Sequence, residues 1–177
     1  MDCRFLIGDE VLRCSCQVKT IYEVGGEKVK MQNIRLSMLW FWIAYLIVTL
    51  IGIGHTVFNI AVLHMKSMKD GPGMGEGYEK TKPWHPLYNI IVFSFFGYLY
   101  FNGLKDPSMQ EALLTGLIWA AVCLVFDAIG WVMVKHPWSL SLKEFYIDYQ
   151  PWISLIYLAI FLGPVVGYLI RRIFFIG

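Results

Sequence analysis

Four long apolar stretches dominate the chain, and polar connections separate them. They cover residues 36–63, 87–104, 109–134 and 152–170. Because about 20 apolar residues in a helix cross the hydrocarbon core of a bilayer, each stretch is a candidate membrane span. The pattern predicts an all-α membrane protein, built as a bundle of four transmembrane helices.

The three connections between these stretches differ in character. The first contains Asp70-Gly71-Pro72-Gly73-Met74-Gly75-Glu76-Gly77, which glycine and proline keep from forming a stable helix. The second, residues 105–108, is short, so the second and third helices are expected to be antiparallel neighbours, and Ser108 followed by Glu111 predicts a capping box. The third, residues 135–151, alternates large apolar and polar side chains, which predicts an interfacial segment in the headgroup region before the fourth helix.

Residues 1–30 differ from the rest of the chain. They contain five acidic residues and no continuous apolar core, which excludes a cleavable signal sequence. Gly25-Gly26-Glu27 can be encoded by a purine-rich ribosome-binding sequence at a suitable distance before Met31. We therefore interpret 1–30 as a non-core extension that precedes the true start at Met31, and 31–177 as the four-helix membrane domain of a bacterial protein.

Composition agrees with a membrane location. Hydrophobic residues make up 57% of the chain and charged residues 16%, well below the quarter typical of soluble proteins. The net charge of +2, without a basic cluster, argues against nucleic acid as a partner. We expect a multi-pass protein of the bacterial cytoplasmic membrane. The distribution of lysine and arginine over the whole chain favours cytoplasmic termini, although a start at Met31 reverses that balance.

Two titratable residues lie deep within predicted spans, where polar groups are costly and often functional. Counted from the helix ends, His55 and Asp127 lie at similar depth below the surface that carries the two longer connections, which predicts a contact between them. Ser94 and Tyr157 fall near the same level, and Asn59 lies one turn from His55. These five residues are the candidate polar layer. A His–Asp pair could bind a proton or ligand, or simply join two helices.

Metal and cofactor sites receive little support. The four cysteines form neither a CxxC pair nor a Cys/His ligand set. His85 and His136 are the best of the weak metal candidates, because both lie near the longer connections, but their spacing adds nothing further. Both also sit beside tryptophan and proline, which is typical of residues that anchor helix ends at a membrane interface. We predict no cofactor and no metal.

Three functional classes remain open. The first is an accessory or interaction subunit of a membrane assembly, favoured because the chain is small and contains no GxSxG or HExxH element. The second is a small transporter or ligand binder that uses the His55 and Asp127 layer. The third is an enzyme acting on a lipid or another apolar substrate. Besides the lipid bilayer, the expected partner is a second copy of the chain or another membrane protein.

Overall fold

The computed structural model describes residues 20–24, 27–67, 70, 74–136 and 138–176. In chain order its elements are β1 (Thr20–Val24), β2 (Glu27–Met31), α1 (Ile34–Ala61), α2 (Glu76–Thr81), η1 (Lys82–Trp84), α3 (His85–Asn102), α4 (Met109–Asp127), η2 (Ala128–Met133), α5 (Leu142–Tyr146) and α6 (Trp152–Ile176).

The four predicted stretches all form long helices, and the first two begin and end two residues earlier than expected. Three of them are long and apolar enough to cross a membrane: α1, α4 continued by η2, and residues 152–174 of α6. The helix α3 has only 18 residues, and it is less apolar because it contains a histidine, two asparagines and three tyrosines. The structure therefore supports a helical membrane protein with three candidate spans.

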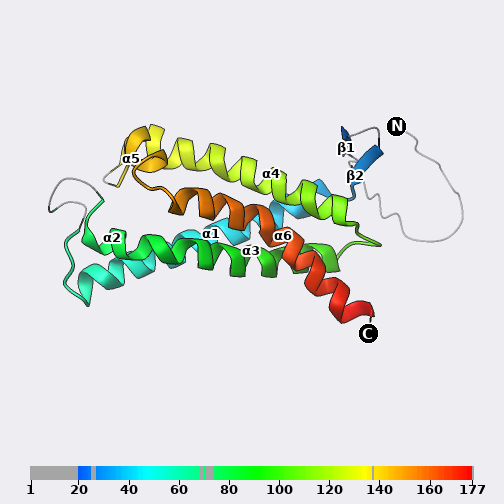
Figure 1. The fold of residues 1–177 in the computed structure, drawn as a ribbon, viewed down its shortest axis with the longest axis horizontal. Coiled ribbons are helices and arrows are strands. Elements are labelled where there is room, and N and C mark those ends of the chain that lie inside the picture. Colours follow the sequence, from blue (N-terminus) through cyan, green and yellow to red (C-terminus); the bar gives the residue numbers. More distant parts are fainter. Residues whose placement is uncertain (1–19, 25–26, 68–69, 71–73, 137, 177) are drawn as a thin grey trace, which may run out of the picture.

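The long helices lie side by side and give the molecule two distinct ends (Figure 1). One end carries the connection from α1 to α3 and the connection from η2 to α6, and is called the loop end below. The opposite end carries the β1–β2 hairpin, the short link between α3 and α4, and the end of α6. Apolar residues of the long helices face outward as well as inward, as expected for helices surrounded by lipid.

Glycines bring α3 and α6 unusually close together. A Cβ atom on Gly97 would lie 2.8 Å from the Cα of Pro164, and one on Gly167 would lie 2.4 Å from the backbone nitrogen of Tyr98. Side chains at these positions would push the two backbones apart. Gly163 and Gly167 of α6 both take part in this contact, in which small residues let the backbones of two membrane helices approach closely.

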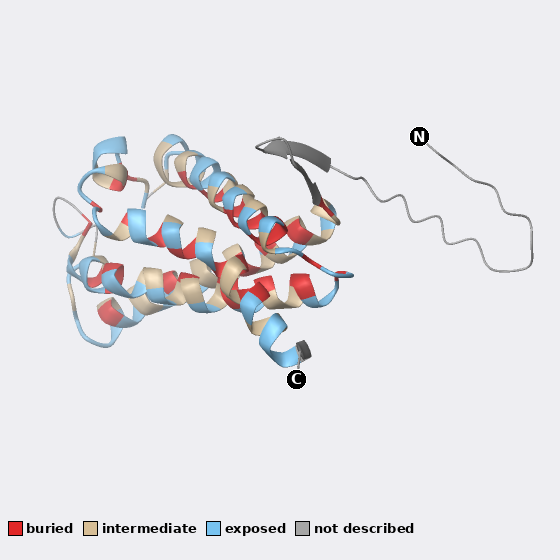
Figure 2. Ribbon diagram, turned by 45° about the vertical axis from the view of Figure 1, so that its right-hand side comes forward, coloured by how far each residue is buried: buried red, intermediate tan, exposed pale blue. Residues whose placement is uncertain are grey.

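Buried residues follow the inner faces of the helices (Figure 2). At the centre, the ring of Trp119 lies 5.7 Å from that of Phe93 and 6.1 Å from that of Phe41, measured between centroids. The indole N–H of Trp119 donates to Ser37 Oγ at 2.9 Å, so the buried nitrogen is satisfied. These aromatic contacts join α1, α3 and α4.

Local capping explains where several helices begin. The side chain of Asn33 accepts from the Leu36 N–H at the start of α1, and Ser108 accepts from the Glu111 N–H at the start of α4. The predicted capping box at Ser108 is thus half formed, since the Glu111 carboxylate accepts from the Gln32 N–H at 2.8 Å. A complete capping box, between Ser141 and Glu144, begins α5 instead.

The segment expected to lie in the headgroup region folds back onto the loop end of the bundle. Leu140, Phe145 and Tyr149 are buried against the other helices, whereas Leu142 and Ile147 are exposed. The alternating pattern of residues 135–151 therefore indicates a segment that packs one face against the other helices. The interfacial interpretation missed this contact.

The N-terminal extension is described only in part, because residues 1–19, with Cys3, Cys14 and Cys16, lie outside the described residues. The strands β1 and β2 pair antiparallel, with Thr20 opposite Met31 and Val24 opposite Glu27. Met31, where we placed the start of the membrane domain, is fully buried near Tyr100 and Ala112. Within the connection at residues 70–77, residues 71–73 lie outside the described residues, whereas Met74 is buried and Glu76 and Gly77 begin α2. The expectation that its glycines prevent a helix is therefore wrong for its last two residues.

Candidate functional site

A cavity of about 330 Å³ lies inside the loop end of the bundle. Helices α1, α3, α4 and α6 form its walls, and Tyr78 of α2, Phe145 of α5 and Tyr149 also line it. Most of its lining is aliphatic or aromatic. Small-molecule sites in proteins commonly have this volume and character, with a few polar groups that fix the orientation of the ligand.

Asp127 is the principal polar group of the cavity wall. It lies at the end of α4, directly before η2, and it is only 8% exposed. Its Oδ1 accepts from the Tyr45 hydroxyl at 2.7 Å, and its Oδ2 accepts from the Tyr157 hydroxyl at 3.2 Å and from the Cys123 thiol at 3.4 Å. Three helices thus hold one carboxyl group through donors that carry no positive charge.

His85, the first residue of α3, provides a second polar group on the cavity wall. Its Nδ1 shares a hydrogen bond of 2.7 Å with the Tyr149 hydroxyl, and Tyr149 also contacts the Tyr78 ring. The Nε2 atom of His85 is buried and has no hydrogen-bond partner within the described residues. It lies against Gly52, where a Cβ atom would come within 3.1 Å of it. The glycine on α1 therefore makes room for the imidazole.

Burial controls the protonation of Tyr78 and Tyr149, two of the tyrosines that line the cavity. Burial, with smaller contributions from Asp127 and Glu79, raises the pKa of Tyr78 to about 12. Burial and the neighbouring Tyr78 also raise the pKa of Tyr149 above its ordinary value. Both phenols therefore remain neutral at physiological pH and are available as hydrogen-bond donors.

A buried lysine lies behind these tyrosines. The Lys82 ammonium is 5.0 Å from the centroid of the Tyr149 ring and 6.0 Å from that of Tyr78, while its charge is neutralised by Glu79 at 2.6 Å. A cation held between tyrosine rings and a carboxylate is stable in this part of the protein. Lys82 itself does not line the cavity.

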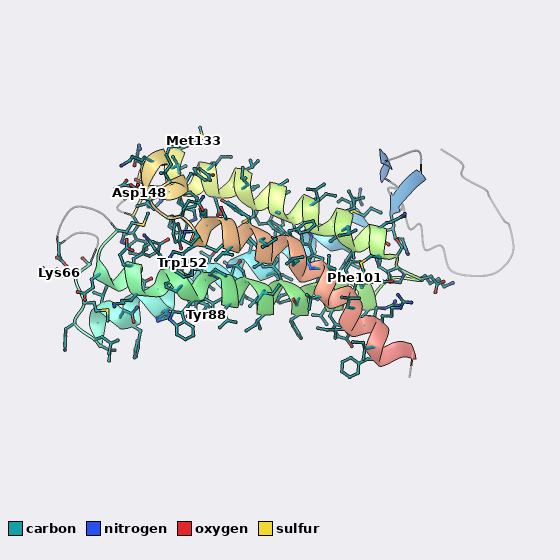
Figure 3. The ribbon with its side chains drawn as sticks, viewed as in Figure 1. Lys66, Tyr88, Phe101, Met133, Asp148 and Trp152 are labelled. Carbon is teal, nitrogen blue, oxygen red and sulfur yellow. The ribbon has the colours of Figure 1, made fainter. Side chains whose placement is uncertain are left out.

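The structure separates His55 from Asp127. The imidazole of His55 is hydrogen-bonded through Nδ1 to the Tyr88 hydroxyl, whereas the α1 residue that reaches Asp127 is Tyr45. Tyr45 precedes His55 by ten residues, or about 15 Å along a helix. His55 therefore lies closer to the loop end than Asp127, and the direct hydrogen bond expected between them is not formed. Tyr88 is seen in this half of the molecule in Figure 3.

Of the other predicted residues, Tyr157 joins Asp127 as expected from its depth. Asn59 is buried and donates to Gly77 O and Thr81 Oγ1, so it fixes α2 to α1 rather than lining the cavity. Ser94 is buried between α3 and α6, and its hydroxyl has no hydrogen-bond partner within the described residues.

The two weak metal candidates are not close partners. His136 is hydrogen-bonded through Nε2 to Gly130 O and through Nδ1 to the Trp138 N–H, whereas His85 faces the cavity. Within the part of the chain that the structure describes, no group of three or more histidine, cysteine, aspartate or glutamate side chains could hold a metal ion.

Comparisons with known proteins give no further information on the function of this site. No protein-family model, curated protein or solved structure matches the chain.

Sequence analysis missed Tyr45, Tyr78, His85 and Tyr149 as parts of one polar site. His85 was assigned to helix anchoring because proline and tryptophan flank it. The available signal was the number of tyrosines near the loop end, since buried phenols need hydrogen-bond partners and so gather around polar groups.

Proposed function

We propose that the protein is an integral membrane protein of four spans that binds a small, mostly apolar molecule in the cavity at its loop end. The observation that carries this proposal is the combination of a cavity of about 330 Å³ with Asp127 and His85 on a largely apolar wall. This agrees with the second of the three classes considered from sequence. The accessory-subunit class was based on the absence of catalytic motifs. An accessory subunit needs no cavity of this kind, whereas a ligand-binding protein does.

The fourth span in this proposal is α3. Its 18 residues extend about 27 Å as a helix, close to the roughly 30 Å of a hydrocarbon core. Its close contact with α6 and its aromatic contacts with α1 and α4 support a place within the bundle, where neighbouring helices shield its polar residues. Labelling of single cysteines introduced at Asp106 and Glu76 should then occur from opposite sides of the membrane. Labelling of both from the same side would contradict the fourth span.

Ligand binding can be tested with a variant that fills the cavity. Ile156 of α6 lines the cavity and is 7% exposed, whereas Leu158 of the same helix is 50% exposed and points outward. Ile156→Trp should therefore occupy ligand space, and Leu158→Trp serves as the matched control.

The measurement is thermal unfolding of the purified protein with a panel of small aromatic amines, alcohols and carbonyl compounds. A ligand at a hundred times its dissociation constant stabilises the folded state by about 2.7 kcal/mol, which is measurable as a rise in unfolding temperature. At least one chemical class should stabilise the natural protein and Leu158→Trp but not Ile156→Trp. If no class stabilises the natural protein, or all three proteins respond alike, the proposal is wrong.

A further inference from the structure

We infer that the molecule bound in this cavity is a lipophilic organic cation, such as a protonated amine, whose positive charge pairs with Asp127. This inference rests on the proposed function and names its ligand class. It follows from the charge of the cavity wall, the hydrogen bonds of Asp127 and the aromatic lining.

The cavity wall has a carboxyl group and lacks a cation to balance it. Among its lining residues, Asp127 is the acidic one, and neither lysine nor arginine is present. Lys82, which is buried outside the cavity lining, is already neutralised by Glu79 at 2.6 Å. A buried carboxylate without a positive partner is destabilising, and a cation bound beside it with good geometry offsets part of that cost.

The hydrogen bonds of Asp127 leave room for one more donor. A carboxylate offers about four acceptor positions, and Tyr45, Tyr157 and Cys123 use three of them. Two of these donors reach Oδ2, so the remaining capacity is on Oδ1, the oxygen bound to the Tyr45 hydroxyl. Because Tyr45 itself lines the cavity, the N–H of an ammonium group there can approach Oδ1 from the cavity side.

Aromatic side chains supply the other half of a cation site. Trp131, Trp138, Phe145, Tyr88 and Tyr149 all line the cavity, and their ring faces attract positive charge while their apolar surface accepts a hydrocarbon group. The position of the Lys82 ammonium over the Tyr149 ring shows the same interaction within this protein. An anion would lose these contacts and be repelled by Asp127.

The test uses probes of equal shape and different charge. Benzyldimethylammonium is a cation with one N–H, isobutylbenzene is its uncharged isostere, and phenylacetate is an aromatic anion. Binding is measured by titration calorimetry into the protein in lipid nanodiscs, with empty nanodiscs subtracted. Asp127→Asn removes the charge but keeps a hydrogen-bonding side chain, and Asp148→Asn removes an exposed carboxylate near the same end, outside the cavity.

We expect Asp127→Asn to weaken benzyldimethylammonium binding by about tenfold or more, while isobutylbenzene binding changes little and Asp148→Asn leaves both unchanged. Comparing variants for one probe cancels the different partition of the probes into lipid. If Asp127→Asn fails to fold, the natural protein still decides between the charges, because benzyldimethylammonium must bind more tightly than phenylacetate.

Two other results would overturn the inference in different ways. If isobutylbenzene binds and Asp127→Asn weakens neither probe, or if phenylacetate binds more tightly than the cation, the cavity binds ligands but the cationic class is wrong. If none of the three probes binds the natural protein and the wider panel above also fails, the proposed function fails with it.

Discussion

The close contact of α3 and α6 makes Gly167 a position at which a single added methyl group should be disruptive. A Cβ atom there would lie 2.4 Å from the backbone nitrogen of Tyr98 and 2.6 Å from the carbonyl oxygen of Ser94. Ordinary contacts begin about 1 Å farther out, and backbone atoms cannot rotate away as a side chain can. Gly167→Ala therefore requires the two helices to separate by roughly 1 Å over a tightly packed surface.

Overpacking of this kind costs about 1–3 kcal/mol, and the backbone clash at Gly167 favours the upper end of that range. Alanine recovers up to about 1 kcal/mol through its higher helix propensity, so we expect a net destabilisation of about 2 kcal/mol. The control is Gly54→Ala in α1, because a Cβ atom on Gly54 meets nothing within 4 Å. That variant should be as stable as the natural protein or slightly more stable.

Unfolding of both variants would be followed by circular dichroism in detergent. The comparison isolates the packing term, because the two changes share the same gain in helix propensity and differ in what the new methyl group meets. A Gly167→Ala protein as stable as Gly54→Ala would refute the close packing of α3 on α6.

Three further perturbations test other parts of the structure. Ser37→Ala leaves the buried indole N–H of Trp119 without its acceptor and should cost about 1–3 kcal/mol in thermal or denaturant unfolding. Glu111→Leu removes the acceptor of the Tyr100 hydroxyl and should cost a similar amount, whereas Glu111→Gln should cost less because an acceptor remains. Folding favours the neutral form of Tyr78, whose pKa rises from an ordinary 10.0 to about 12. The stability that this shift contributes is therefore complete below about pH 10 and is lost as the pH rises towards about 12. Ultraviolet titration should show at least one phenol that ionises only on unfolding or above about pH 11.

The four long helices were predictable from sequence, because each coincides with an apolar stretch, and three of them are long and apolar enough to span a membrane. Their ends were also close to prediction where a capping residue or proline marks them, as at Ser108. The close contact at Gly163 and Gly167 was predictable from sequence, because small residues at helical spacing let a neighbouring helix approach closely. These features depend on local sequence and on the general properties of a bilayer.

The partners of Asp127 were not predictable in the same way. Depth was counted from the ends of the apolar stretches, which assumes that all helices end in one plane. The helix α1 extends beyond that plane at the loop end, so its residue at the level of Asp127 is Tyr45 rather than His55. Sequence also does not specify how each helix is rotated about its axis, and this rotation directs His55 towards Tyr88.

The buried polar groups that hold the fold together differ from Asp127 and His85 on the cavity wall, and this difference supports the proposed site. Asn59 donates its amide hydrogens to two acceptors, and Ser37 accepts from Trp119, so the bonds they make hold elements of the fold together. Asp127 and His85 retain hydrogen-bonding capacity and lie on the wall of the same cavity. Retaining such capacity inside an apolar bundle lowers stability, as a ligand site does until its ligand arrives. A ligand that supplies positive charge to Asp127 and a hydrogen-bonding group to His85 would satisfy both, which is the physical reason for placing function at the loop end.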